Sequence, residues 1–430
     1  MSAEDHSALP AAAASDGTTA FGASLRAARL RRGLTLRELA RRTHYSHSYM
    51  SKVENGIKHP SVELAQRCDK VLDLGGELAE SLTVRALAPA APDAWPRPAQ
   101  LPRGPVQFVG RTRELAELTA ALLPDDSQAG VVPVVAVDGP PGVGKSALVV
   151  RWAHRNSHLF PDGVLFADLG GYGGDLQSPD AVLKVFLHEL GIGGLPSVAT
   201  GQPASLFRSF LHGRRLLIVL DNAADAQQVR ALLPGAPGCA VVVTSRQRLS
   251  GLTVRDGAQR ITLPPLGQAD AVALLAEMIG RVRVGAEPEA AAAIAACCAG
   301  LPLALRLAGE RLTNLPAKPL HAFAAELAAE EHALDMLTVL GDPRSAVRTV
   351  FSWSYLALAP ADARVFQQLG LHPSAEFSIT AATAVTGLPP VETERALERL
   401  AAAHLIEPVG PQRYRLHNPL RLYARERARA

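Results

Sequence analysis

Cysteine is scarce in this sequence, with four residues in 430. None of them stands at the paired spacing of a zinc ligand set, and two are adjacent within an alanine-rich helical pattern. A disulfide scaffold and a zinc module are therefore disfavoured. We expect reduced core thiols in a cytoplasmic protein, with a redox role as the weaker alternative. The four residues are Cys68, Cys239, Cys297 and Cys298.

Long apolar runs are also missing, since none approaches the roughly 18 residues needed to cross a membrane. Residues 1–20 lack the basic start and dense apolar stretch of a secretory signal, so we expect a flexible tail. The hydrophobic content of 48% is nevertheless ample for packed cores. A chain of 430 residues is long enough for about three domains at roughly 100–200 residues each.

Lysine is rare, with six residues beside 38 arginines, yet one lysine completes a phosphate-binding loop. Residues 139–146 read Gly-Pro-Pro-Gly-Val-Gly-Lys-Ser, between an apolar run at 131–138 and a helical pattern from Ala147. Such a loop wraps backbone N–H groups around a polyphosphate. We expect Lys145 to reach the β- and γ-phosphates and Ser146 to hold Mg²⁺. The expected nucleotide contacts are Gly139, Pro140, Pro141, Gly142, Val143, Gly144, Lys145, Ser146 and Ala147.

Four further apolar runs follow the loop, at 164–168, 216–221, 240–244 and 261–263, with helical patterns between the earlier ones. This alternation predicts a parallel sheet whose ligand lies at the carboxyl ends of the strands. The second run ends in Asp221, where Mg²⁺ requires a carboxylate. Lys145 and Asp221 are thus the candidate catalytic pair. The next run leads to Arg246, within reach of a γ-phosphate.

Positive charge is concentrated near the N-terminus. Residues 21–60 hold nine basic residues against two acidic ones, a net charge of +7, which leaves −4 for the rest of a chain whose total is +3. Such a concentration is typical of a protein that binds a polyanion, although a solvated helical face can also produce it.

Helix signals in the same region favour DNA as the polyanion. Thr35 and Glu38 have the spacing of a capping box, Ser46 can cap a helix that ends at Gly56, and Ser61 can cap another. Two short helices joined by a tight turn, the second with a polar outer face, fit a major groove. The expected DNA contacts are Arg41, Arg42, Ser46, His47, Ser48, Ser51, Lys52 and Lys58.

The segments Leu34-Thr-Leu-Arg-Glu-Leu-Ala and Tyr49-Met-Ser-Lys-Val-Glu-Asn-Gly56 resemble the lambda-repressor-like (XRE) helix-turn-helix domains. The resemblance covers about residues 21–83 and implies that 46–52 approach base edges and phosphates of double-stranded DNA. A four-helix module that binds protein is the alternative.

The ordered set of loop, Asp221, Thr-Ser-Arg246 and Gly300-Leu-Pro302-Leu resembles the NB-ARC domains of STAND signalling ATPases, over roughly residues 100–430. The resemblance implies that Val109 and Arg111 lie by the adenine, that Arg246 senses the γ-phosphate and that Pro302 packs on the base. It also implies a C-terminal winged helix, whose His417 touches the β-phosphate of ADP.

We therefore predict a multidomain protein. After the tail come an all-α helix-turn-helix (21–83) and a proline-rich linker (84–104). An α/β P-loop domain with a parallel sheet (105–263), a small helical subdomain (264–332) and a winged helix (345–430) follow. Within the last domain we expect helices at 361–369, 379–386 and 391–405, then a hairpin that turns at Gly410-Pro411.

Three departures from the NB-ARC pattern bear on function. Asn222 stands where a second acid often follows Asp221, Asn418 replaces an aspartate after His417, and no repeat of roughly 30–50 residues follows the winged helix. The first departure predicts slow hydrolysis at most, and the last leaves the input signal unidentified.

The resulting hypothesis is a transcription regulator switched by ATP and ADP. ADP, held by Lys145, Ser146, Pro302 and His417, would keep the winged helix closed over the core. ATP, read by Arg246 and by Mg²⁺ on Ser146 and Asp221, would favour an open form that self-associates on DNA. A STAND ATPase whose N-terminal helices bind a protein is the rival, and a metabolic kinase ranks third.

Overall fold

The computed structural model describes residues 15–58, 60–74, 78, 96–123, 130–192, 203–329, 332–338, 342 and 346–429. The chain forms two compact units, residues 1–95 and residues 96–430. The predicted tail falls mostly outside the described residues, as does most of the predicted linker. No helix in the described ranges combines the length and the apolar character of a membrane span.

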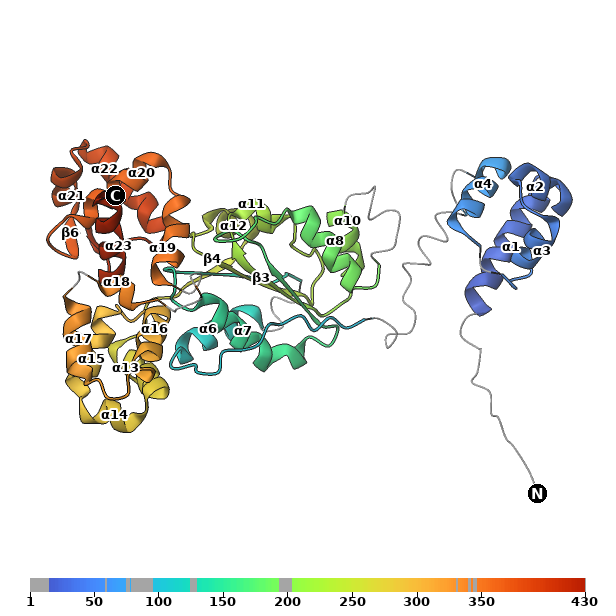
Figure 1. Cartoon of the computed structure of the whole chain (residues 1–430). Coiled ribbons are helices and arrows are strands. Elements are labelled where there is room, and N and C mark those ends of the chain that lie inside the picture. Colours follow the sequence, from blue (N-terminus) through green and yellow to red (C-terminus); the bar gives the residue numbers. More distant parts are fainter. Residues whose placement is uncertain are drawn as a thin grey trace, which may run out of the picture. The chain divides into compact units, whose positions relative to one another are not determined.

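The described part of the first unit contains four helices, which Figure 1 shows in blue. They are α1 (Ser15–Arg31), α2 (Leu36–Thr43), α3 (His47–Glu54) and α4 (Val62–Leu72). The capping box of Thr35 and Glu38 is present, and Ser46 and Ser61 cap α3 and α4 as predicted. Helix α1 begins at Ser15, so residues 15–20 do not belong to a flexible tail and that prediction was wrong there.

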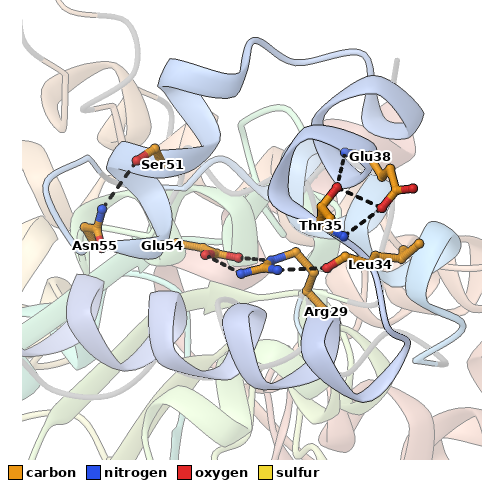
Figure 2. A network of polar contacts seen from close by, with 7 residues as sticks. All are labelled: Arg29, Leu34, Thr35, Glu38, Ser51, Glu54 and Asn55. Atoms are coloured by element: carbon orange, nitrogen blue, oxygen red, sulfur yellow. Dashed lines mark hydrogen bonds and ion pairs between the residues drawn. The ribbon is translucent and has the colours of Figure 1, made fainter.

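Fully buried apolar side chains from all four helices form the core of this unit, among them Leu25, Leu39, Met50 and Leu64. A polar network reinforces it, as Figure 2 shows. The Arg29 guanidinium bonds to the Glu54 carboxylate at 2.6 Å and donates to the Leu34 carbonyl at 2.8 Å. Arg29 is therefore a structural residue that ties α1 to α3, although it contributes to the basic charge of the segment.

Gly22 allows α1 to approach the end of α3 closely. A Cβ atom at this position would lie 2.6 Å from the Val53 carbonyl oxygen and 2.4 Å from that of Glu54. We expect Gly22→Ala to destabilise this unit by about 1–3 kcal/mol, because the clash with backbone outweighs the gain of about 1 kcal/mol in helix propensity. Faster amide hydrogen exchange in α1 and α3 of the full chain would report the loss. Ser24→Ala, on the exposed face of α1, should leave exchange unchanged.

The second unit is built on a five-stranded parallel sheet with the order β2-β3-β4-β1-β5. Its strands are β1 (Val134–Asp138), β2 (Val164–Asp168), β3 (Leu217–Ala223), β4 (Ala240–Ser245) and β5 (Gln259–Thr262). All five strands were predicted. β1 and β4 are buried along their whole length, because helices cover both faces of the sheet.

In Figure 1, α6 and α7 lie on one side of the sheet, and α8, α10, α11 and α12 lie on the other. The first pair is α6 (Thr112–Leu122) and α7 (Lys145–Asn156), which the short helix η2 (Ser157–Leu159) follows. The others are α8 (Pro179–Glu189), α10 (Pro203–Phe210), α11 (Ala226–Arg230) and α12 (Ser250–Asp256). The parallel strands therefore present their carboxyl ends at one edge of a two-sided α/β layer, as predicted.

The end of the predicted linker packs against the edge strand β2 of this sheet. Ala99 forms a parallel bridge with Val164, the Val164 N–H donates to the Pro98 carbonyl at 2.7 Å, and Gln100 binds the Phe166 N–H at 3.1 Å. Residues 96–104 therefore do not act as a connector, because their backbone covers the exposed edge of β2.

The next region is helical, as predicted, and the C-terminal region adds a small antiparallel sheet of order β6-β8-β7. The helices of the first are α13 (Gln268–Ile279), α14 (Arg281–Ala286), α15 (Pro288–Cys297), α16 (Pro302–Thr313), α17 (Leu320–Ala328) and α18 (Ala333–Met336). The C-terminal elements are α19 (Val347–Leu356), α20 (Pro360–Gly370), β6 (Glu376–Ser378), α21 (Ile379–Thr386), α22 (Pro390–Ala402), β7 (Glu407–Gly410), β8 (Arg413–Arg415) and α23 (Asn418–Arg429).

The three predicted helices of the C-terminal region and its hairpin are confirmed, although α22 ends at Ala402, before the predicted Leu405. Helix α23 was not predicted, and it packs closely on Gly370 of α20. One apolar core runs from the α/β layer into the helical and C-terminal regions. The four cysteines are free and at least half-buried, as predicted, and burial raises the pKa of the Cys68 thiol to about 12.

Candidate functional site

The phosphate-binding loop connects β1 to α7, and its glycines have the conformations that such a loop needs. Gly142 and Gly144 have φ of 80° and 94°, in the left-handed region that favours glycine. A Cβ atom on Gly139 would lie 2.5 Å from the Leu263 carbonyl oxygen, so the backbone of the loop passes directly against the end of the sheet. With these glycines, the backbone N–H groups of the loop can face a phosphate at the N-terminus of α7.

A cavity of about 690 Å³ lies at this loop and at the carboxyl ends of the strands. Its size is within the range of small-molecule sites. Of the predicted nucleotide-binding residues, the cavity is lined by Val109, Arg111, Gly142, Val143, Gly144, Lys145, Ser146, Ala147, Asp221, Arg246 and Pro302. The predicted residues Gly139, Pro140, Pro141 and His417 do not line it.

Sequence reasoning missed other cavity residues because only tertiary structure brings them here. Some flank the predicted motifs, such as Phe108, Thr244 and Leu303. Others are Asp168 at the end of β2, Tyr172 in the loop that follows it, and Trp353 of α19.

One end of the cavity is formed by the segment before α6 and by the start of α16. The Leu303 N–H donates to the Gly142 carbonyl at 3.1 Å, which joins α16 to the loop. Arg111 is buried, where it pairs with Glu114 at 3.3 Å and donates to the Val143 carbonyl at 3.3 Å. Arg111 therefore supports the loop and also lines the cavity, as do Val109 and Pro302.

Lys145 lies at the centre of the site. Its ammonium donates to the carbonyls of Gly139 at 2.8 Å and Pro140 at 3.0 Å. Burial, together with repulsion from Arg246, lowers the pKa of Lys145 to about 7. A lysine at this position suits a polyphosphate ligand, because the negative charge of the bound phosphates would stabilise the protonated ammonium.

The lowered pKa of Lys145 predicts that ADP binding takes up protons. At pH 8 a lysine of pKa about 7 is mostly neutral, and bound phosphates would raise its pKa again. Uptake should approach one proton, and affinity should fall as the pH rises above about 7. Calorimetric titrations at pH 8 in two buffers of different ionisation enthalpy measure this uptake. Equal enthalpies in both buffers would contradict the prediction.

Ser146 and Asp221 form a candidate Mg²⁺ site. The Ser146 hydroxyl donates to Asp221 Oδ1 at 2.8 Å, and the Thr244 hydroxyl donates to the same oxygen. Burial raises the pKa of Asp221, and these hydrogen bonds oppose that rise. The hydroxyl and carboxylate are the oxygen ligands that Mg²⁺ takes from a protein when phosphate and water complete its shell.

Arg246 extends from the end of β4 to α19 in the C-terminal region. Its guanidinium donates to the Val350 carbonyl at 2.6 Å and to the Ser354 hydroxyl at 3.0 Å. It also lies over the rings of Tyr172, at 5.0 Å, and Trp353, at 5.3 Å. The predicted γ-phosphate sensor is thus in the cavity, but its hydrogen bonds go to the C-terminal region.

His417 lies away from the phosphate-binding cavity, and the expectation that it touches the β-phosphate does not hold in this structure. Its Nε2 is 3.1 Å from the Glu407 carboxylate. Both line a separate cavity of about 200 Å³ that Pro140 and Arg248 also line. His417 follows the hairpin of β7 and β8, and it borders the phosphate-binding loop on the side where Pro140 lines this second cavity.

A different histidine, His404, contacts the strand that carries the loop. Its Nε2 lies 3.3 Å from Oδ1 of Asp138, the last residue of β1, and both side chains are almost fully buried. Among the described residues, no hydrogen bond of good geometry reaches Nε2 or either Asp138 carboxylate oxygen, and the Arg260 Nε lies 4.0 Å from Oδ2. The Arg248 N–H donates to the Ala402 carbonyl at 3.1 Å beside it. The segment at the end of α22 therefore contacts the end of β1, where the phosphate-binding loop begins.

In the first unit, the predicted DNA-contact residues lie on and around α2 and α3. Arg41, Arg42, Ser46, His47, Ser48, Lys52 and Lys58 are exposed, and Ser51 is half-buried. Ser51 accepts a hydrogen bond from Asn55 at 3.4 Å (Figure 2). Lys58 lies over the ring of Tyr49 at 4.8 Å, and Tyr49 stacks on Tyr45. The face thus combines stacked aromatic rings with exposed basic side chains.

Residues 20–82 match a protein family described as a helix-turn-helix domain, so the first unit contains that domain. The regulatory protein AfsR of Streptomyces griseus is 41% identical to this chain over 368 residues, or 85% of this chain and 36% of that protein. AfsR of Streptomyces coelicolor is 42% identical over 334 residues, covering 76% and 33%. The chain spans about a third of the length of these curated relatives.

Two solved structures are also similar. The Walker-type ATPase of Pyrococcus abyssi aligns with 76% of this chain and 98% of its own, at 14% identity and a TM-score of 0.48. A STAND protein with a tetratricopeptide repeat sensor from Pyrococcus horikoshii aligns with 78% of this chain and 44% of its own, at 19% identity and a TM-score of 0.33.

Proposed function

We propose that this chain is a DNA-binding transcription regulator whose state depends on bound ATP or ADP. Its central α/β domain would bind the nucleotide with Mg²⁺, and its helix-turn-helix domain would bind double-stranded DNA. The two relatives at 41–42% identity are regulatory proteins by name, which supports this role for the longer proteins in which the shared segment occurs.

The arrangement of Arg246 is the observation that carries the switch. Its bonds to Val350 and Ser354 both use Nη1 of the guanidinium, so a γ-phosphate that takes up Nη1 would break the contact with these two residues. ATP would therefore compete with α19 for Arg246, whereas ADP, which lacks the γ-phosphate, would leave the contact in place. Coupling of about 1–3 kcal/mol between the two sites would change DNA occupancy several-fold or more.

We assign the chain to the STAND class of ATPases, with an NB-ARC nucleotide-binding domain and a C-terminal winged helix. The strand order and the position of Asp221 support the first assignment. Three helices and an antiparallel hairpin at 360–415 support the second. In this chain Arg246 and His404, rather than His417, would hold the winged helix against the nucleotide-binding domain.

Open molecules would self-associate and so present two helix-turn-helix domains to one DNA. Paired domains bind half-sites about one helical turn apart, and the second contact adds avidity. Within each domain, α3 would enter the major groove, with His47, Ser48 and Ser51 toward the base edges. Arg41, Arg42 and Lys58 would contact phosphates.

The test selects binding sequences for the full chain from a random duplex library and then footprints them with ADP and with a non-hydrolysable ATP analogue. We expect stronger and paired protection with the analogue. Identical protection with both nucleotides would reject the switch.

The rival function is a STAND ATPase whose N-terminal helices bind a protein. The basic charge and exposed polar face of α3 favour DNA. A groove-binding domain should lose affinity steeply as salt rises, and Arg41→Ala or Lys58→Ala should flatten that dependence by about one unit of slope each. Binding to duplex DNA that is weak and insensitive to salt would favour the rival.

A further inference from the structure

The carboxylate of Asp168 belongs to the same cavity as the candidate Mg²⁺ ligand. Strands β2 and β3 are parallel neighbours, and their register places Asp168 opposite Asp221 at the carboxyl ends. Of the described residues that line the cavity, only these two are acidic. Oδ1 of Asp221 accepts from the hydroxyls of Ser146 and Thr244, whereas the Asp168 side chain is exposed.

The residue that follows Asp221 positions this second carboxylate. Asn222 has a φ of 58° at an irregularity of β3, and its N–H donates to the Thr244 hydroxyl at 2.9 Å. A left-handed residue interrupts the alternation of side chains along a strand. The side-chain amide nitrogen of Asn222 donates to Asp168 Oδ1 at 3.2 Å and to the Tyr172 carbonyl at 3.1 Å.

The two oxygens of Asp168 are not equivalent. Oδ1 accepts the bond from Asn222 and another from the Gly170 N–H at 2.9 Å, and these two bonds hold the carboxylate in place at the end of β2. No donor from the described part of the chain reaches Oδ2. One oxygen is thus held in place, and the other keeps lone pairs that can accept a hydrogen bond from water.

We propose that Asp168 is the carboxylate that orients and deprotonates the attacking water during ATP hydrolysis. Asn222 holds it in position and takes the place of an acid on β3. This inference rests on the proposed nucleotide-binding function and adds a turnover step to it.

The step balances as a hydrolysis. The water oxygen forms a bond to the γ-phosphorus of ATP, and the bond between that phosphorus and the β,γ-bridging oxygen breaks. The water proton passes to Oδ2 of Asp168 and then to solvent. The products are ADP and inorganic phosphate. An amide at position 222 cannot accept this proton, so the charge required for proton transfer comes from the neighbouring strand.

Asp168→Asn in the full chain separates this role from a structural one. The asparagine keeps Oδ1 as the acceptor for Gly170 and Asn222 but replaces Oδ2 with an amide nitrogen. We expect the turnover number for MgATP to fall by about 100-fold or more. Affinity for a fluorescent ADP analogue should stay within about threefold of wild type. Asp175→Asn, an exposed carboxylate in the loop that follows β2 and outside the cavity, is the matched control.

Each other outcome has a definite meaning. Wild-type turnover in Asp168→Asn, or a wild-type protein that binds MgATP without hydrolysing it, would overturn the role of Asp168 and leave the nucleotide switch intact. A variant that loses both binding and turnover would assign Asp168 to support of the loop alone. A wild-type protein that binds neither nucleotide would instead overturn the proposed function itself.

Discussion

Replacing His404 with alanine is expected to lower the free energy of unfolding of the second unit by about 3 kcal/mol, because the buried Asp138 carboxylate loses a close polar partner. The Asp138 carboxylate would lose the imidazole that lies 3.3 Å from Oδ1 and would keep the Arg260 guanidinium, whose Nε is 4.0 Å from Oδ2. Denaturation by guanidinium, followed by circular dichroism, measures the loss. His158→Ala removes an exposed histidine and should cost little.

The effect of His404 also has a pH dependence. Burial lowers the pKa of His404 below 6.5, although Asp138 opposes that change. The folded state therefore binds fewer protons than the unfolded one, so the contribution is complete above about pH 6.5 and is lost as the pH falls through the folded pKa. The difference between wild type and His404→Ala should shrink below pH 6.5. In a double variant, Asp138→Asn should recover part of the loss, and strict additivity would contradict the pairing.

Lys145→Ala is expected to weaken binding of ADP with Mg²⁺ by about 100-fold, or about 3 kcal/mol, since the lysine supplies charge-assisted hydrogen bonds to the phosphates. Equilibrium titration with a fluorescent ADP analogue measures the change. Lys184→Ala, on the exposed face of α8, is the matched control. Amide exchange in α1–α4 should not change, because those helices form a separate unit. Wild-type affinity in Lys145→Ala would place the nucleotide elsewhere.

Local sequence predicted those parts of the molecule that local chemistry determines. The phosphate loop, the five strands and the caps of α2, α3 and α4 each depend on a few adjacent residues, and all were found. Segment 96–104 was misread because proline favours an extended chain both in a connector and along a sheet edge. Ser15–Ala20 lacks the apolar spacing that marks a helix, and no periodic signal was recognised in α23.

The unpredicted part of the site depends on contacts between distant residues. Asp168 and Asn222 meet because β2 lies beside β3, and Asn222 by itself suggests only a missing acid. His404 and His417 lie 13 positions apart in one region, but the turn after α22 brings His404 to Asp138, while the hairpin takes His417 to Glu407. A family pattern can identify a histidine of interest, but it does not show which carboxylate that histidine meets.

The contact between Gly173 and Trp353 should make the intrinsic fluorescence of Trp353 sensitive to the position of α19. A Cβ atom on Gly173 would lie 2.4 Å from the indole, so the ring rests directly on that backbone while the Arg246 cation lies beside it. Trp152 is buried and bonded to Thr119, and Trp95 lies outside the described residues. Release of α19 would move Trp353 into water and shift its emission to longer wavelength, so intrinsic fluorescence could follow the switch without any attached dye.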